Sequence, residues 1–230
     1  PLYLQVQSPA DYLDVDRPQS TSGSYGRADF YPQLTLPIRS WPWLSLSLTG
    51  GERFTWYGDS VDPLTQKFTG ASKLRSLPSA SAQLVGPSFS RVFAGLGGFE
   101  KFKHVIEPRF TYSYLGKYDD DRFIPLFDEI DSNRSTESGR FALVNRLLGK
   151  ARTGDSDAGS AREILYFELA QEVSFDREQP LQSSRDGQRQ KTAGPITALL
   201  RVSPSDAFHA KVEADYSTLF SRLESRSLSA

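Results

Sequence analysis

The residues best suited to chemistry are three carboxylates in the segment FIPLFDEIDSNRS: Asp128, Glu129 and Asp131. Carboxylates spaced this closely can bind calcium or act as an acid–base pair. The segment lacks the glycine and the distal glutamate of an EF-hand-like loop. We therefore expect a solvated loop beside a strand end, with a metal site as the less favoured interpretation.

The other chemically capable residues form no recognisable catalytic or cofactor motif. His104 and His209 are the only histidines, and they are far apart. The glycine-rich AGLGGF at 94–99 lacks the GK[ST] that a phosphate-binding loop needs, so we expect a turn. No serine lies in a G-x-S-x-G motif, and the chain has no cysteine. These features predict no enzyme, no cofactor and no metal.

The elements that would position these residues are strands. In FHAKVEADYS at 208–217, apolar or aromatic residues alternate with His209, Lys211, Glu213 and Asp215. WLSLSLTG at 43–50 and REILYFELAQEVSF at 162–175 show the same period of two, which predicts strands with two different faces. GRFALVNRLLGKAR at 139–152 suits a helix by composition, but its neighbours favour a strand. We expect an all-β chain with roughly eleven or twelve strands.

The composition limits the class of protein. The 230 residues carry 27 Lys+Arg and 28 Asp+Glu, a formal net charge of −1, which gives no electrostatic signature for nucleic acid. Aromatic residues make up 12% of the chain, which is high for so polar a sequence. The chain has no methionine, and both ends have the pattern of strands. We expect an internal piece of a longer protein, with residues 1–230 forming one section of a single domain without an internal boundary.

The expected connections differ in length. TGGE at 49–52 and SPSD at 203–206 are typical of short turns, whereas 17–29, 149–162 and 176–194 are long and hydrophilic. This asymmetry is typical of a transmembrane β-barrel, in which apolar residues face lipid and polar ones line a wet lumen. A soluble β-sandwich has the same alternation with the opposite orientation, its apolar face packed inward. Patterning alone leaves the two architectures open.

Several sequence segments resemble those of the LptD family of lipopolysaccharide-assembly outer-membrane proteins, the organic-solvent-tolerance family. They are KHVIEPRFTYSY (103–114), IPLFDEID (124–131), NRLLGKAR (145–152), REILYFELAQEVSF (162–175), VSPSDAFHAKVEADY (202–216) and RADFYPQLTLPI (27–38). The first two segments, at this spacing, are fairly specific to the family, while the other segments are common in β-barrels. Together the segments span nearly the whole chain.

This resemblance implies the middle section of an antiparallel up-and-down transmembrane β-barrel in the outer membrane of a Gram-negative bacterium. Its implied function is to transport lipopolysaccharide and insert it into the outer leaflet. The implied partners are lipopolysaccharide, membrane lipid, an LptE-like lipoprotein that plugs the lumen, and a periplasmic lipopolysaccharide-bridge protein that binds a domain outside these residues. The alternatives are another outer-membrane barrel (a porin or receptor) and a soluble secreted β-sandwich that binds a ligand.

In this barrel, the alternation of side chains along each strand predicts which of them face the lumen, because a shift of the strand register by one residue would put charged side chains into hydrocarbon. Ile106, Phe110, Tyr112 and Tyr114 would face lipid, in a strand that begins near Ile106 and is entered through Pro108. The lumen-facing candidates are Glu107, Arg109, Thr111, Glu168, Glu172, His209, Lys211, Glu213 and Asp215.

Overall fold

The computed structural model describes residues 1–230 except 18–20, 133–134, 153–160, 178, 206 and 230. Almost every regular element in this part of the chain is a strand. The elements are β1 (Tyr3–Gln7), β2 (Ala10–Asp16), β3 (Ser22–Trp41), β4 (Leu44–Tyr57), β5 (Lys73–Val85), β6 (Phe89–Ala94), β7 (Phe99–Leu115), the 3₁₀ turn η1 (Asp121–Phe123), β8 (Thr136–Ala151), β9 (Ala161–Ser174), β10 (Gln182–Ser183), β11 (Gln190–Lys191), β12 (Ala193–Ser205), β13 (Phe208–Ser217) and β14 (Arg222–Ser229).

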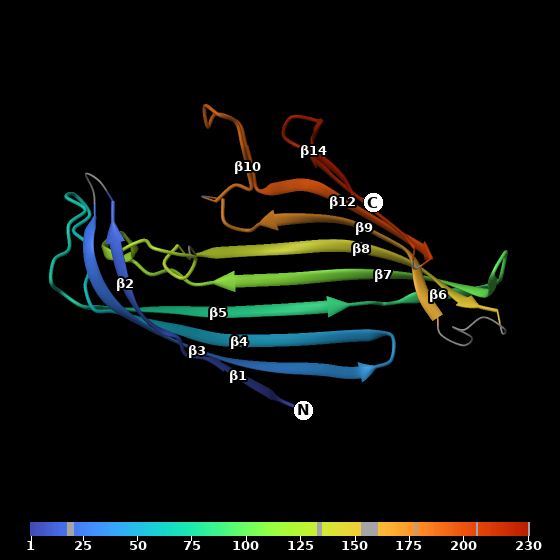
Figure 1. Ribbon diagram of the computed structural model, residues 1–230, viewed down its shortest axis with the longest axis horizontal. Helices are drawn as coiled ribbons and strands as arrows, with labels where there is room; N and C mark the ends of the chain where they lie inside the picture. The colour runs from blue at the N-terminus through green and yellow to red at the C-terminus, as the bar shows by residue number, and fades with distance from the viewer. Residues whose placement is uncertain (18–20, 133–134, 153–160, 178, 206, 230) are drawn as a thin grey trace. The chain divides into compact units, whose positions relative to one another are not determined.

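Twelve of these strands form one hydrogen-bonded sheet. The order of its main path is β1-β3-β4-β5-β7-β8-β9-β12-β13-β14, with β2 also pairing with β3 and β6 with β7 (Figure 1). Chain neighbours are therefore mostly sheet neighbours, as in an up-and-down arrangement. The path does not return to β1, so the sheet formed by the described residues is open. The all-β prediction, the strand prediction for 139–152 and the turn prediction for 94–99 are confirmed.

By proximity of their residues, the strands divide into two compact units. The first unit comprises Pro1–Pro37, Ser47–Ala82 and Ser113–Glu137, and the second comprises Ile38–Leu46, Gln83–Tyr112 and Ser138–Ala230. That the chain belongs to a single barrel domain stays a prediction.

In the first unit, one face of the sheet buries charge while the other exposes apolar side chains. On β3, Arg27 and Asp29 are 4% and 3% exposed, and on β5 Arg75 is fully buried. On the opposite face, Trp56 of β4 is 45% exposed and Leu74 of β5 is 58% exposed. A soluble protein has the reverse arrangement, with apolar side chains inside.

The second unit has the same division, and its strand registers show which residues share a face. Glu168 of β9 is opposite Leu199 of β12, which is opposite Glu213 of β13. The adjacent row joins Phe167, Leu200 and Val212. The first of these rows therefore holds two glutamates with one leucine, and the adjacent row is wholly apolar, so the two faces of the sheet also differ in the second unit.

Two expectations about strand boundaries are wrong. Residues 22–29 were expected in a loop, but they begin β3 and pair with β2 from Ala10↔Ala28 to Asp16↔Ser22. TGGE lies inside β4, because Gly51 gives room to the neighbouring strand: a Cβ there would lie 2.7 Å from the Pro32 carbonyl oxygen. The turn between β3 and β4 falls instead at Pro42 and Trp43.

The interpretation of Pro108 as a strand-entry residue is also wrong, because β7 begins at Phe99. The register between β6 and β7 ends at Phe89↔Ile106, so Pro108 lies beyond the last pair and its missing N–H breaks no bond of that ladder. Its carbonyl accepts a hydrogen bond from the Gly86 N–H at 2.9 Å.

Parts of the expected long connections belong to strands. Within 176–194, β10 and β11 form a two-stranded hairpin. In the connection expected at 149–162, β8 continues to Ala151 and β9 begins at Ala161, and residues 153–160 lie outside the described part.

Candidate functional site: an acidic strap on a basic strip

The polar face of the first unit carries four basic side chains close to the ends of β3, β4 and β5. We name this group the basic strip; it consists of Arg27, Arg53, Lys73 and Arg75. Arg27 and Asp29 share one face of β3, and Arg53 binds Asp29. Lys73 and Arg75 share one face of β5, and Arg75 binds Asp131 as Arg27 does, so all four lie on one face of the sheet. The segment between β7 and β8 lies on this strip. We name its residues 117–132 the acidic strap, because they hold six acidic and two basic residues.

Arg27 is the main attachment point of the strap. Its Nη1 and Nη2 donate to Oδ1 and Oδ2 of Asp128 at 2.8 and 2.6 Å, a bidentate pair. Nη1 also donates to Asp131 at 3.0 and 3.1 Å, and Nη2 donates to Asp11 of β2 at 3.1 Å. One buried guanidinium therefore binds three carboxylates, two of them from the strap. Bidentate charged pairs of this kind are among the stronger hydrogen-bonded contacts in proteins.

Asp131 is held from two further strands. The Tyr57 hydroxyl of β4 donates to its Oδ1 at 2.9 Å, and Arg75 of β5 donates from Nη1 to its carbonyl oxygen at 3.0 Å. Nη2 of Arg75 donates to the carbonyl of Ile130. Because Asp131 is only 4% exposed, these contacts satisfy a buried charge rather than a surface pair.

The sequence FDEID folds locally to present both carboxylates. Oδ2 of Asp131 accepts the Phe127 N–H at 2.9 Å, and Oδ1 of Asp128 accepts the Ile130 N–H at 2.8 Å. Aspartates stabilise turns in this way by bonding to nearby backbone N–H groups. Arg27, helped by the Ile130 N–H, keeps the pKa of Asp128 below its ordinary value of 3.8, so this carboxylate is charged at neutral pH.

The first half of the strap is attached by weaker contacts. Nζ of Lys73 lies 2.5 Å from Oδ2 of Asp120 and 4.6 Å from the centre of the Phe123 ring. Nη1 of Arg75 lies 3.9 Å from Oδ1 of Asp121, and the Val61 N–H donates to the Phe123 carbonyl at 2.9 Å.

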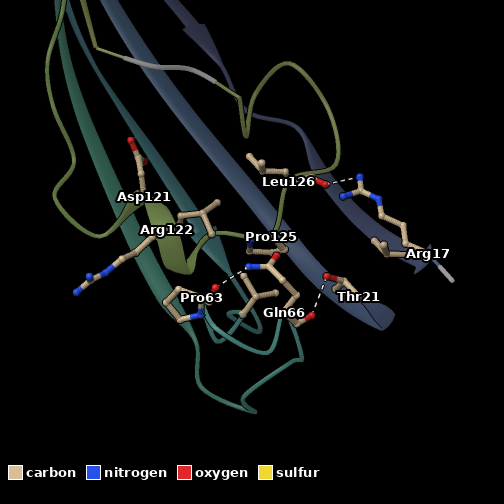
Figure 2. A pocket seen from close by; sticks show the side chains of 11 residues that line it. Arg17, Thr21, Pro63, Gln66, Asp121, Arg122, Pro125 and Leu126 are labelled. Atoms are coloured by element: carbon tan, nitrogen blue, oxygen red, sulfur yellow. Dashed lines mark hydrogen bonds between the residues drawn. The ribbon is translucent and has the colours of Figure 1, made fainter. Parts of the chain in front are cut away.

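Below the strap is a small apolar cluster with a cavity beside it. Leu13, Val15, Tyr25, Tyr57 and Ile124 form the cluster. The cavity measures about 260 Å³ and is bounded by β2, the loop after β4 and the strap. Figure 2 shows hydrogen bonds beside it: Arg17 donates to the Leu126 carbonyl at 2.6 Å, and Thr21 to the Gln66 carbonyl at 2.8 Å.

A second group of polar residues, Asp29, Arg53 and Thr55, forms a compact network on the same face. Nε of Arg53 donates to both Asp29 oxygens at 3.0 Å, and the Thr55 hydroxyl donates to Oδ1 of Asp29 at 2.7 Å. The guanidinium of Arg53 also lies 5.1 Å from the centre of the Tyr31 ring. This network fixes part of the basic strip without using the strap.

The carboxylate cluster expected at 128–131 is thus only partly as predicted. The solvated loop is the wrong description for Asp131, because this residue is buried against Arg27, Tyr57 and Arg75. Glu129 is exposed. Among the described residues, no cluster of potential ligands has the arrangement of a metal site.

The predicted lumen-facing residues all lie in the second unit. Nε of Arg109 donates to Glu107 at 2.7 Å on β7. Glu168 pairs with Arg140 of β8, and Glu172 lies opposite Arg140 in the register. Thr111 lies further along β7. That these side chains line a lumen stays a prediction.

On β13, Lys211 pairs with Glu213 at 2.6 Å, and Asp215 and Glu213 accept hydrogen bonds from Ser225 and Ser227 of β14. Nδ1 of His209 lies 3.1 Å from the Ser203 hydroxyl. A hollow of about 500 Å³ lies beside them, and its lining includes Arg140, Glu168, Leu199, Glu213, Asp215, Ser225 and Ser227.

Sequence reasoning missed Arg27, Tyr57 and Arg75, which hold the strap. The alternation of Tyr25, Arg27 and Asp29 with Gly26 and Ala28 was available as a strand signal, but the surrounding serines and glycines favoured a loop. Arg27 and Asp128 are 101 positions apart, so no local pattern links them.

A large antiparallel sheet that buries charge on one face and exposes aromatic and aliphatic side chains on the other is the wall of an outer-membrane β-barrel. None of the described residues forms a helix long and apolar enough to cross a membrane.

The comparison with protein families is more specific. The family described as LptD, LPS transport system D, matches residues 1–230, and the chain belongs to this family. It is a family of transport and assembly proteins of the Gram-negative outer membrane, and lipopolysaccharide is its substrate. A search of curated protein sequences finds no match.

Proposed function

We propose that this chain is a section of the barrel wall through which lipopolysaccharide is inserted into the outer leaflet of the outer membrane. The observation that carries the proposal is the family match over all 230 residues, on a sheet with one charged and one apolar face. The charged face provides a hydrated path for sugar and phosphate groups, while the acyl chains leave sideways into lipid. No covalent bond changes in this process.

The hydrogen-bonding groups on the charged face of the second unit support a path for saccharides. Paired charges such as Arg140–Glu168 and Lys211–Glu213 lie beside the hydroxyls of Ser225 and Ser227. Such a surface offers many donors and acceptors, and its charges largely neutralise one another. A sugar can therefore move along it without binding tightly at one place.

The partners follow from the same proposal. An LptE-like lipoprotein would fill the lumen against the charged face, and a periplasmic bridge protein would deliver the lipid to a domain outside these residues. Residues 1–230 would then be one section of a single barrel, closed by further strands at its two edges, because unpaired backbone groups are not tolerated in lipid.

The test is photocrosslinking in cells that make the intact protein. A photoreactive residue replaces Lys211 in one strain and Val212 in another, since these neighbours project from opposite faces of β13. We expect position 211 to crosslink to lipopolysaccharide or to a lipoprotein, and position 212 to bulk lipid only.

Two results would overturn the proposal in different ways. If the protein is in the outer membrane but position 211 captures neither species, a porin or receptor replaces the transport function. If the protein never enters the membrane fraction, a soluble β-sandwich replaces the barrel.

A further inference from the structure

We propose that the basic strip is a binding site for the phosphate groups of lipopolysaccharide, and that the acidic strap occupies this site as an internal substitute for the ligand. This inference rests on the proposed transport function. The strap would be an autoinhibitory cover: when it is in place the site is filled, and when it lifts the site accepts a phosphorylated saccharide.

The first argument is charge. The strap has six acidic and two basic residues, a net charge of −4. The four basic side chains of the strip face only two acidic ones from the sheet, Asp11 and Asp29, which leaves a net charge of +2. The strap therefore neutralises a positive surface, and lifting it would uncover that surface.

The second argument is geometry. Arg27 binds Asp128 through two parallel N–H···O bonds, and guanidinium groups bind phosphate in the same way. Arg27 of β3 and Tyr57 of β4 donate to the Asp131 carboxylate, and Arg75 of β5 donates to the backbone carbonyls of Ile130 and Asp131 beside it. These buried donors lie close together and suit an oxyanion.

The third argument concerns how the strap is held. Ile124 and Tyr118, in the first half of the strap, contact the apolar cluster, whereas Leu126 and Phe127 of the second half are 54% and 46% exposed. The second half of the strap is held chiefly by ion pairs and hydrogen bonds. Since a buried ion pair contributes little net free energy, an anion of similar geometry can exchange with the strap at small cost.

The first experiment uses a photoreactive residue in place of Ser79, which lies on the same face of β5 as Arg75. In the intact protein in cells, we expect little lipopolysaccharide crosslinking with the native strap. The double change Asp128→Asn, Asp131→Asn weakens the strap and leaves the strip intact, so crosslinking should rise several-fold. Adding Arg75→Gln should return it to the native level. Glu129→Gln, in an exposed strap residue, is the matched control.

A crosslinking probe at position 211 in the same strains separates failure of this inference from failure of the proposed function. If position 211 captures lipopolysaccharide while position 79 does not respond to the weakened strap, the strip is not a phosphate site and the transport function stands. If position 211 captures none in any strain, the proposed function itself is wrong.

The second experiment needs no variant and so does not depend on folding of a mutant. Hydrogen exchange of the Phe127 and Ile130 amides reports strap opening, because both donate to strap carboxylates. Purified intact protein is mixed with lipopolysaccharide, with lipopolysaccharide stripped of phosphate, or with inorganic phosphate. We expect faster exchange with intact lipopolysaccharide, a smaller acceleration with inorganic phosphate, and none with stripped lipopolysaccharide. Equal acceleration by stripped lipopolysaccharide, or no acceleration by intact lipopolysaccharide, would overturn the proposal.

Discussion

Replacing Arg27 by glutamine tests how the strap is held. The change removes the cation that binds Asp128, Asp131 and Asp11, and leaves the fully buried side chain of Asp131 without its ionic partner. Breaking a buried ion pair costs about 3–5 kcal/mol. Because the Asp128 side chain is 36% exposed and water can reach it, we take the lower end, about 3 kcal/mol, as the loss in strap attachment.

The assay is hydrogen exchange of the Phe127 and Ile130 amides in the intact protein. A loss of about 3 kcal/mol in local opening free energy speeds their exchange roughly 150-fold, at 1.36 kcal/mol per factor of ten. Arg91→Gln, in an exposed residue of β6, is the control and should leave both amides unchanged. If Arg27→Gln changes neither amide by more than the control does, Arg27 does not hold the strap.

Three other perturbations have definite expected results. Arg27 lowers the pKa of Asp128, so the stabilisation from this pair is complete above the ordinary value of 3.8 and is lost as the pH falls through the lower pKa of the folded state. Pepsin cleavage of the strap should therefore increase on acidification. Asp128→Asn should weaken this pH dependence. Val212→Arg places a charge on the apolar face near the middle of β13 and should cost ~2–4 kcal/mol and reduce the folded, heat-modifiable form on gels, whereas Lys211→Gln should not. Gly86→Ala should destabilise the folded barrel by about 1–3 kcal/mol in a urea titration, because Gly86 has φ +112° and an added Cβ would lie 2.3 Å from the Trp43 carbonyl oxygen. An unchanged urea midpoint would show that the backbone relaxes at this position.

The sequence predicts strands well where one residue type fills each face. In β13, His209, Lys211, Glu213 and Asp215 alternate with apolar residues, and the observed strand is Phe208–Ser217. It predicts poorly where glycine and serine interrupt the pattern, as at the start of β3. There the pairing with β2 supplies the ladder, and this information is not contained in the local residues.

The candidate site depends on contacts that are distant in sequence. The three carboxylates of 128–131 were identified from their types and spacing, but their partners come from β3, β4 and β5. A carboxylate beside a buried arginine and one in a solvated loop look the same in a single sequence. The burial of Asp131 is therefore visible only in the structure, where the strap packs on the sheet.

The central claim is that one face of this sheet meets water and the other meets lipid. Residues 1–230 hold no cysteine, so once any cysteine elsewhere in the intact protein is replaced by serine, single cysteines can be placed along β13 and tested in outer membranes with a charged, water-soluble thiol reagent. We expect labelling of Lys211→Cys, Glu213→Cys and Asp215→Cys, and protection of Val212→Cys and Ala214→Cys. Uniform labelling, or labelling of the even positions only, would contradict it.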